Sequence, residues 1–177
     1  MTINANGNLV GGNLCLAKAG LSGLAGAATT FSTTAAVAYA IGGKFAASKG
    51  AVAGGATPTV DVVTGAAFKP VQKNQGAVFV FTLDAAGNVG VAQGTLPVSP
   101  TTTGLQTNVD DGGNFSLLPQ FPALPDTLVA IGYAVVRATS AYAGAGFQFG
   151  AANWNTAGIV VTAPQDVMTL PAVPQVA

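Results

Sequence analysis

The fold class is decided by one stretch of the sequence, Ala77-Val78-Phe79-Val80-Phe81-Thr82-Leu83, and by the residues that follow it, Asp84-Ala85-Ala86-Gly87-Asn88 and Val89-Gly90-Val91-Ala92-Gln93-Gly94-Thr95. Two β-prone runs separated by Asp, Gly and Asn predict an antiparallel hairpin, because these turn residues accept local hydrogen bonds or adopt positive φ angles. Residues 78–83 are apolar on both faces of the expected strand. We therefore expect this strand to be central in a sheet and covered on both sides.

Strand signals also occur before and after this hairpin. Residues 36–41 alternate larger and smaller side chains and precede Gly42-Gly43, which predicts a second hairpin with 44–47 as the returning strand. The residues expected on one face of its first strand are Val37, Tyr39 and Ile41. Residues 96–125 contain five prolines and are expected to be mostly loop. Further strands are expected at 114–118, 127–139, 146–150 and 158–162.

This pattern predicts an all-β fold, a β-sandwich or jelly roll of about seven to eight strands, because no long run has helical periodicity. Residues 1–30 have no aromatic side chain and several glycines, so they predict an extended N-terminal arm. A β-sandwich domain over 31–163 follows, and an extended C-terminal tail over 164–177 completes the chain. The alternative for residues 1–30 is a strand or loop packed on the protein's own domain.

The charged and reactive side chains are few. The 177 residues include no histidine, no glutamate and one cysteine, with six basic and six acidic groups that cancel to a net charge of zero. Acid–base catalysis and metal binding rely on histidines, clustered carboxylates or thiolates, so we expect no enzyme, catalytic residue, cofactor or metal. The basic residues are scattered, whereas phosphate binding needs clustered Lys or Arg, so we expect no nucleic-acid partner.

Membrane insertion and secretion are not indicated either. The apolar stretches 14–28 and 35–41 are short or interrupted by Lys18 and glycines, so neither is expected to cross a bilayer. The first eight residues lack the basic and apolar regions of a secretion signal. Cys15 has no cysteine partner in the chain, and we expect it to be a small buried hydrophobic side chain.

The remaining polar motifs have structural explanations. Asp84 and the pair Asp110-Asp111 precede glycines and are expected to form turns, because the further ligands of a calcium loop are absent. Ser48 and Lys49 are adjacent, so their side chains are expected to point apart and form no catalytic dyad.

One aromatic motif leaves two interpretations open. Trp154 lies between Asn153 and Asn155 and is expected to pack in the core. The alternative is that Trp154 stacks on a sugar, with Tyr142 at the same groove.

A low charge and a zero net charge predict association with other protein, since interspersed charge normally keeps soluble proteins apart. We expect a homo-oligomer with no membrane or nucleic-acid partner. Leucines in the N-terminal arm and apolar residues in the tail are the expected contact residues. They are Leu9, Leu14, Leu16, Leu21, Leu24, Val167, Met168 and Leu170.

Residues 31–171 resemble tailed-bacteriophage virion structural proteins. The resemblance is carried by Ala38-Tyr39-Ala40-Ile41-Gly42-Gly43-Lys44-Phe45, the run 118–125, Ile131-Gly132-Tyr133-Ala134-Val135-Val136, Phe147-Gln148-Phe149-Gly150 and Asn153-Trp154-Asn155-Thr156-Ala157-Gly158. It implies a capsid decoration or cement protein on the capsid surface of the virion, with the major capsid protein as partner. A tail-fibre or surface adhesin domain that binds carbohydrate is the alternative. A bacterial cell-surface layer or appendage subunit shares the composition.

Overall fold

A computed structural model describes residues 2–3, 9–10, 12–46, 48–95, 99–100 and 106–176. Across these residues the secondary structure consists of β-strands, turns and bends, with no helix. The structure confirms the all-β class. Among the described residues, no helix has the length and apolar character needed to span a membrane.

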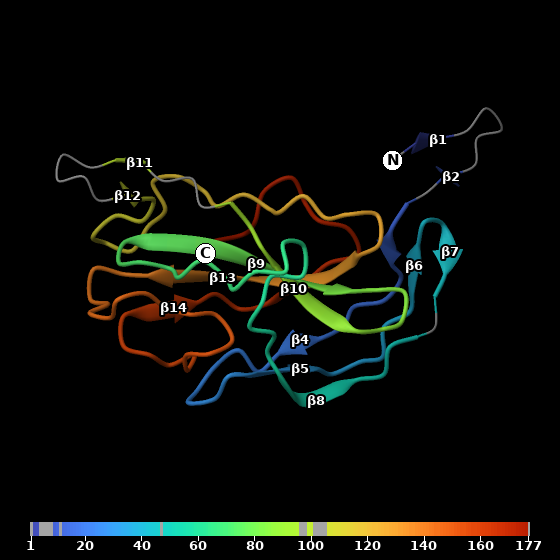
Figure 1. Cartoon of the computed structure of the whole chain (residues 1–177), viewed down its shortest axis with the longest axis horizontal. Helices are drawn as coiled ribbons and strands as arrows, with labels where there is room; N and C mark the ends of the chain where they lie inside the picture. The colour runs from blue at the N-terminus through green and yellow to red at the C-terminus, as the bar shows by residue number, and fades with distance from the viewer. Residues whose placement is uncertain are drawn as a thin grey trace.

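The largest sheet has five antiparallel strands in the order β10-β9-β13-β14, with β15 also paired to β13. Figure 1 shows β9 and β13 running side by side along the middle of the molecule. The strands of this main sheet are β9 (Gln75–Leu83), β10 (Val89–Gln93), β13 (Val129–Ala138), β14 (Ile159–Val161) and β15 (Gln165–Asp166).

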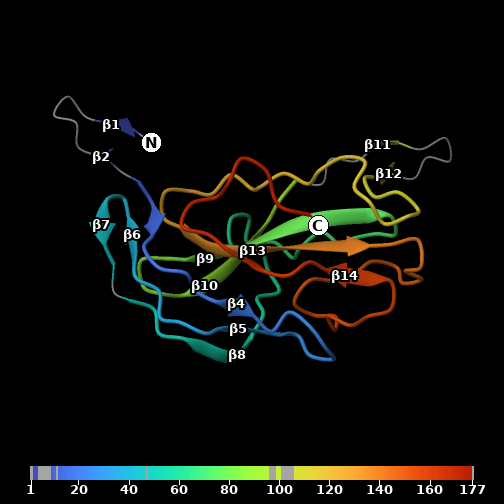
Figure 2. The same ribbon diagram turned by 180° about the vertical axis from the view of Figure 1, so that it is seen from behind.

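Two three-stranded sheets pack next to the main sheet. In Figures 1 and 2 the hairpin of β6 and β7 stands at one end of the molecule, and β4, β5 and β8 lie along one side of the main sheet. The first of these sheets has the order β3-β6-β7 and the second β4-β5-β8. Their strands are β3 (Leu14–Cys15), β6 (Tyr39–Ile41), β7 (Lys44–Phe45), β4 (Leu21–Ser22), β5 (Thr30–Thr33) and β8 (Val52–Ala56).

Two short ladders of two strands complete the described strands. β1 (Thr2–Ile3) pairs with β2 (Leu9–Val10), and β11 (Ser99–Pro100) pairs with β12 (Gln106–Thr107). The described strands are therefore shorter and more numerous than the seven to eight expected. Antiparallel pairing alone does not distinguish a β-sandwich from a jelly roll, so that finer assignment stays a prediction.

The central hairpin is confirmed. β9 pairs with β10 from Leu83↔Val89 to Phe79↔Gln93, and the turn between them includes Gly87 at φ +81°. β9 lies between β10 and β13, and its residues from Gly76 to Leu83 are all buried. The expectation of a central strand covered on both faces is therefore correct.

One face of β9 contributes to an aromatic core. The rings of Phe79 and Phe149 stack with centroids 3.8 Å apart, and Phe68 meets both edge-on at 5.5 and 5.3 Å. Trp154 packs edge-on against Phe149 at 5.1 Å. The edge-on contacts of Phe68 and Trp154 match the edge-to-face arrangement that aromatic rings prefer.

The opposite face of the main sheet is covered by side chains of the proline-rich segment and the C-terminal tail. Val78, Val80, Tyr133 and Val135 form a second buried cluster with Val167 of the tail. The side chains packed against this cluster come from the proline-rich segment and the tail: Phe115, Phe121, Leu124, Leu170 and Val176. The ring of Phe121 meets that of Tyr133 edge-on at 5.0 Å.

The C-terminal tail is extended but docked on the domain. β15 pairs with β13, and Figure 2 shows the tail returning along the sheet toward the C-terminus. The Gln175 amide donates to the Tyr133 hydroxyl at 2.9 Å, and the Cys15 amide donates to the Met168 carbonyl at 3.1 Å. The tail thus joins β13 to the N-terminal segment.

The described part of the N-terminal segment also packs on the domain. Leu21 and Leu24 are buried in the main core, and the Leu21 amide donates to the Asp166 carboxylate at 2.9 Å. Strands β3 and β4 pair with β6 and β5. Residues 12–30 therefore lie packed on the protein's own domain, the arrangement given as the alternative to an extended arm. Residues 1, 4–8 and 11 lie outside the described residues.

Two predicted strands are replaced by single β-bridges. Phe147 makes an isolated bridge to Val71, and Phe115 makes one to Val109. Residues 146–150 alternate like a strand because Phe147 and Phe149 both enter the core. Gly146 and Gly150 flank them at φ +152° and +76°, which takes the backbone out of the strand conformation.

Two turns share the pattern Asp-x-x-Gly-Asn, at 84–88 and 110–114. The Asp84 carboxylate accepts from the Ala86 and Asn88 amides, and the Asp110 carboxylate accepts from the Asn114 amide. Partial burial acts to raise the pKa of Asp84, but the bonds from Asn88, Ala86 and Gly87 together lower it. The Asn114 amide is the main reason that the pKa of Asp110 is lowered. Both aspartates form turns, as predicted.

Candidate interaction surface

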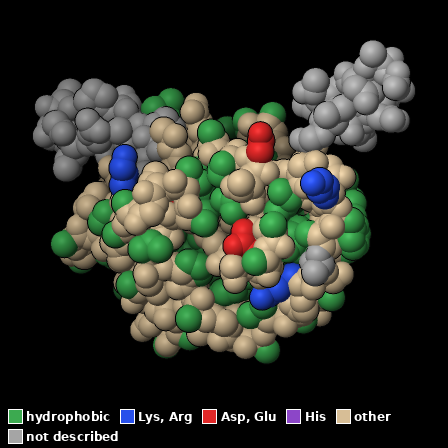
Figure 3. Space-filling view, turned by 45° about the vertical axis from the view of Figure 1, so that its right-hand side comes forward, with side chains coloured by type: hydrophobic (Ala, Val, Ile, Leu, Met, Phe, Trp, Pro, Cys, Tyr) green, Lys and Arg blue, Asp and Glu red, His purple; other side chains and the backbone are tan. Residues whose placement is uncertain are grey.

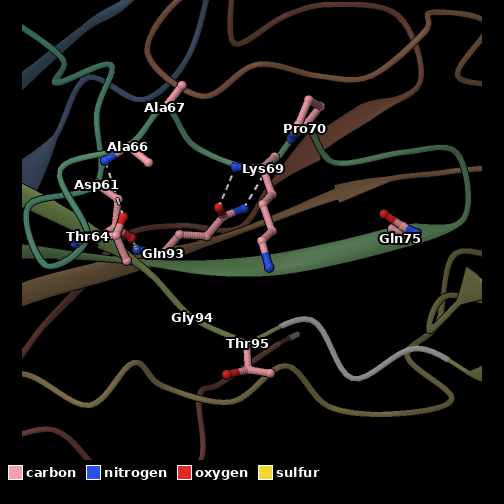
Figure 4. A pocket seen from close by; sticks show the side chains of 10 residues that line it. All are labelled: Asp61, Thr64, Ala66, Ala67, Lys69, Pro70, Gln75, Gln93, Gly94 and Thr95. Carbon is pink, nitrogen blue, oxygen red and sulfur yellow. Dashed lines mark hydrogen bonds between the residues drawn. The ribbon is translucent and has the colours of Figure 1, made fainter.

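A wide hollow of about 540 Å³ lies beside β10 (Figure 4), and the side chains of Asp61 and Gln93 in its lining are engaged in local structure. The Asp61 carboxylate accepts from the amides of Val63, Thr64 and Gln93 at 2.8 to 3.0 Å. The Gln93 side chain exchanges two hydrogen bonds with the Lys69 backbone, both 2.8 Å long. These groups hold the 60–67 turn against the edge of β10. The polar side chains of Asp61 and Gln93 therefore have a structural role at this hollow.

No reactive cluster emerges elsewhere in the described residues, where no group of three or more His, Cys, Asp or Glu side chains is placed to hold a metal. Cys15 is buried, as predicted, and its thiol donates to the Ala17 carbonyl at 2.8 Å. Burial raises the pKa of the Cys15 thiol, the Asp166 charge adds to the rise, and the Ala17 bond opposes it. A thiol in this environment is a poor nucleophile at neutral pH.

The aromatic residues of the carbohydrate interpretation are inside the molecule. Trp154 is 3% exposed and its indole nitrogen donates to the Thr30 carbonyl at 3.0 Å. Tyr142 is buried as well. Neither ring presents a face to a sugar, so the expectation that these two residues form an exposed stacking groove is wrong, and the expectation of core packing for Trp154 is correct.

The surface that stands out is the outer face of the β3-β6-β7 sheet. Leu14 pairs with Ala40, and Ala40 pairs with Phe45, so these three side chains point to the same side. The Leu16 amide donates to the Ala38 carbonyl at 2.8 Å, which continues the pairing by two residues. We call this set the outer face: Leu14, Leu16, Ala38, Ala40 and Phe45.

The two sides of this sheet differ sharply in burial. Cys15 and Tyr39 point inward and are fully buried, and the Tyr39 hydroxyl donates to the Asp84 carbonyl at 2.8 Å. On the outer face Leu16 is 41% exposed and Phe45 is 69% exposed. None of the five outer-face side chains carries a charge. Figure 3 shows this end of the molecule, with hydrophobic side chains among polar atoms and only a few charged groups.

A smaller hollow of about 220 Å³ lies next to this sheet, between the N-terminal segment, the start of β13 and the tail. Asn13 forms one wall, since its side-chain nitrogen donates to the carbonyls of Asp126 and Leu128 at 2.9 and 2.8 Å. Its side-chain oxygen accepts from the Gly42 amide at 2.8 Å. Other residues of the lining are Leu124, Pro125, Leu128, Met168, Thr169 and Leu170. We call it the Met168 hollow.

The structure divides the eight predicted contact residues into three groups. Leu14, Leu16 and Met168 lie on or beside the outer face, and Leu170 lines the Met168 hollow. Leu21, Leu24 and Val167 are buried in the protein's own core in this structure, and their role as contacts stays a prediction. The side chain of Leu9 lies outside the described residues.

Sequence reasoning did not single out Phe45 as an exposed residue of the outer face. The available signal was its place in the strand that returns from the Gly42-Gly43 turn. Phe45 pairs with Ala40, which points to the other face of the sheet from the inward-pointing Tyr39, so Phe45 points outward. Comparison of the chain with protein-family models, curated proteins and solved structures gave no match.

Proposed function

We propose that this chain is a virion structural protein of the head decoration or cement type, which binds the major capsid protein on the capsid surface. The observation that carries the proposal is the uncharged outer face, on which Leu16 and Phe45 stay exposed although their strands are part of a packed domain. An apolar sheet face of this kind is typical of a surface that another protein covers. The resemblance of residues 31–171 to phage virion proteins supports the same assignment.

The mechanism of stabilisation is physical and needs no reactive group. Covering apolar surface contributes about 25 cal/mol for each Å² removed from water. The contact made by one copy is modest, but a symmetric shell repeats it, and simultaneous engagement of neighbouring subunits raises the effective affinity. By covering apolar surface on neighbouring subunits, a decoration protein holds adjacent capsid subunits together.

The carbohydrate-binding alternative has less support. Its expected aromatic residues, Trp154 and Tyr142, are buried. The wide hollow beside β10 is lined by Lys69, Thr64, Gln75 and other polar or small side chains, none of them aromatic. Stacking on a sugar ring therefore has no platform at either place.

The variant Leu16→Asp tests the capsid contact. Placing a carboxylate in a covered apolar site is expected to weaken binding to empty capsid shells by at least about tenfold, because the charge must be desolvated on binding. Binding is measured by co-sedimentation of the purified chain with shells that lack it. Leu16 is 41% exposed in the chain alone, so the variant is expected to fold.

Leu118→Asp is the matched control, because Leu118 is 43% exposed and belongs to the proline-rich segment rather than the outer face. It is expected to leave shell binding unchanged. Equal binding by the wild type and Leu16→Asp would contradict the proposed contact.

A further inference from the structure

Met168 carries an exposed thioether side chain on a fixed part of the C-terminal tail. Its side chain is 49% exposed, although it directly follows Val167, which is buried in the second cluster of the main sheet. The Val167 amide donates to the Ile131 carbonyl at 3.2 Å, and the Met168 carbonyl accepts from the Cys15 amide at 3.1 Å. The backbone at this point is therefore tied to the domain, while the Met168 side chain is left at the surface.

The cysteine of the chain has the opposite environment. The sequence contains one cysteine and two methionines, of which Met1 lies outside the described residues. Cys15 is fully buried, and its thiol donates to the Ala17 carbonyl at 2.8 Å. Oxidation of a sulfur atom depends on its exposure and, for cysteine, on the fraction of thiolate. The fold therefore shields the Cys15 thiol and leaves Met168 open to an oxidant.

We propose that Met168 is a redox modification site, at which hydrogen peroxide converts the thioether to a sulfoxide and thereby weakens the binding of a partner to the outer face. A lone pair of the sulfur attacks one peroxide oxygen, the O–O bond breaks, and a proton moves from the oxygen on sulfur to the leaving oxygen. The sulfur is oxidised by two electrons, and the peroxide is reduced to water. The reaction needs no catalytic residue.

The effect on binding follows from the position of Met168. Successive amides of a strand point to opposite edges, and the Leu16 amide donates toward β6, so the Cys15 amide places Met168 along the other edge of β3, beside the outer face. A sulfoxide oxygen is a polar acceptor, and covering it with apolar surface that offers no donor opposes binding. Met168 belongs to neither buried cluster of the described residues, so oxidation is expected to leave the core intact.

The modification is tested on the purified full chain without any capsid protein. The chain is treated with hydrogen peroxide, folded or unfolded in guanidinium, and the oxidised peptides are quantified by mass spectrometry. Oxidation of Met168 in the folded chain is expected to be within about threefold of its rate in the unfolded chain, and that of Cys15 at least about 30-fold slower than when unfolded. Protection of Met168 equal to that of Cys15 would overturn the proposal.

The effect on binding rests on the proposed capsid contact and is measured by co-sedimentation with empty capsid shells. Oxidised wild-type chain is expected to bind at least about fivefold more weakly than untreated chain, and reduction by a methionine sulfoxide reductase is expected to restore binding. The control is Met168→Leu, whose binding is expected to be the same before and after peroxide treatment. This variant keeps Met1, so a loss caused by oxidation of Met1 would appear in it as well.

The outcomes separate the two proposals. Unchanged binding of the oxidised wild type, or an equal loss in peroxide-treated Met168→Leu, would overturn the assigned role of Met168 while leaving the capsid contact in place. Absence of binding by the untreated wild type would contradict the capsid contact and the effect of oxidation on it, whereas the mass measurement decides the modification site by itself.

Discussion

Removal of residues 165–177 is expected to abolish cooperative folding rather than to leave a trimmed, stable domain. The deleted segment supplies β15, which pairs with β13, and Val167, which is buried in the second cluster of the main sheet. It also supplies the Asp166 carboxylate and the Met168 carbonyl, which accept from the amides of Leu21 and Cys15. Truncation therefore exposes part of one face of the main sheet and leaves the buried amides of Leu21 and Cys15 without partners.

The loss is expected to exceed the margin of a typical domain, which is about 5–15 kcal/mol, because several buried contacts and hydrogen bonds disappear together. The measurement is thermal unfolding by near-ultraviolet circular dichroism, with binding of a hydrophobic dye as a second readout. We expect no cooperative transition and strong dye binding for the truncated chain.

A graded comparison checks that the tail acts through burial. Val167→Ala is expected to cost about 2 kcal/mol, since it removes buried methyl groups. Val173→Ala, at an exposed position of the same tail, is expected to cost close to zero. A truncated chain with the melting temperature of the wild type would show that the tail is dispensable.

Phe149→Ala is expected to have the largest effect among single substitutions in the aromatic core. Phe149 stacks on Phe79 at 3.8 Å and meets Phe68, Phe81 and Trp154 at 5.3, 6.2 and 5.1 Å. Truncating a buried phenylalanine commonly costs about 3–5 kcal/mol, because apolar burial is lost and a cavity remains. For a chain of this length that corresponds to a fall of roughly 10 °C in Tm.

The matched variant is Phe149→Leu, which keeps most of the buried volume and loses the ring. It is expected to lower Tm by less than half as much as Phe149→Ala, and differential scanning calorimetry measures both. Equal stability of Phe149→Ala and the wild type would mean that the cluster around Phe79 is not the core of the fold.

The strands that the sequence predicts well are those whose pattern and turns agree. β9 and β10 follow from apolar runs on either side of an Asp-x-x-Gly-Asn turn, and β6 and β7 follow from alternation around Gly42-Gly43. In these places local residue preferences and tertiary packing favour the same structure, which is the condition under which sequence reasoning succeeds.

The strand expected at 146–150 fails because alternation has a different cause there. Phe147 and Phe149 both enter the core, but they do so from a segment whose only described ladder contact is the bridge to Val71. The Phe149 ring stacks on Phe79, which comes from a distant part of the sequence, and both rings contact Trp154. A periodicity count does not contain that information.

The N-terminal segment shows the same limit for the candidate site. Leu16 and Leu21 have similar sequence surroundings, with glycine and alanine nearby, yet Leu16 is exposed and Leu21 is buried. Leu21 belongs to the main core cluster, and its amide donates to the Asp166 carboxylate 145 residues away. The sequence therefore identifies apolar residues able to bind a partner, and the fold decides which of them remain available.

The central claim is that this chain is a component of a virion shell. It is tested most directly by absolute quantification of the chain against the major capsid protein in purified virions, using mass spectrometry with isotope-labelled peptides from both proteins. The account predicts many copies in a fixed ratio to the major capsid protein. A handful of copies per particle, or none, would contradict it.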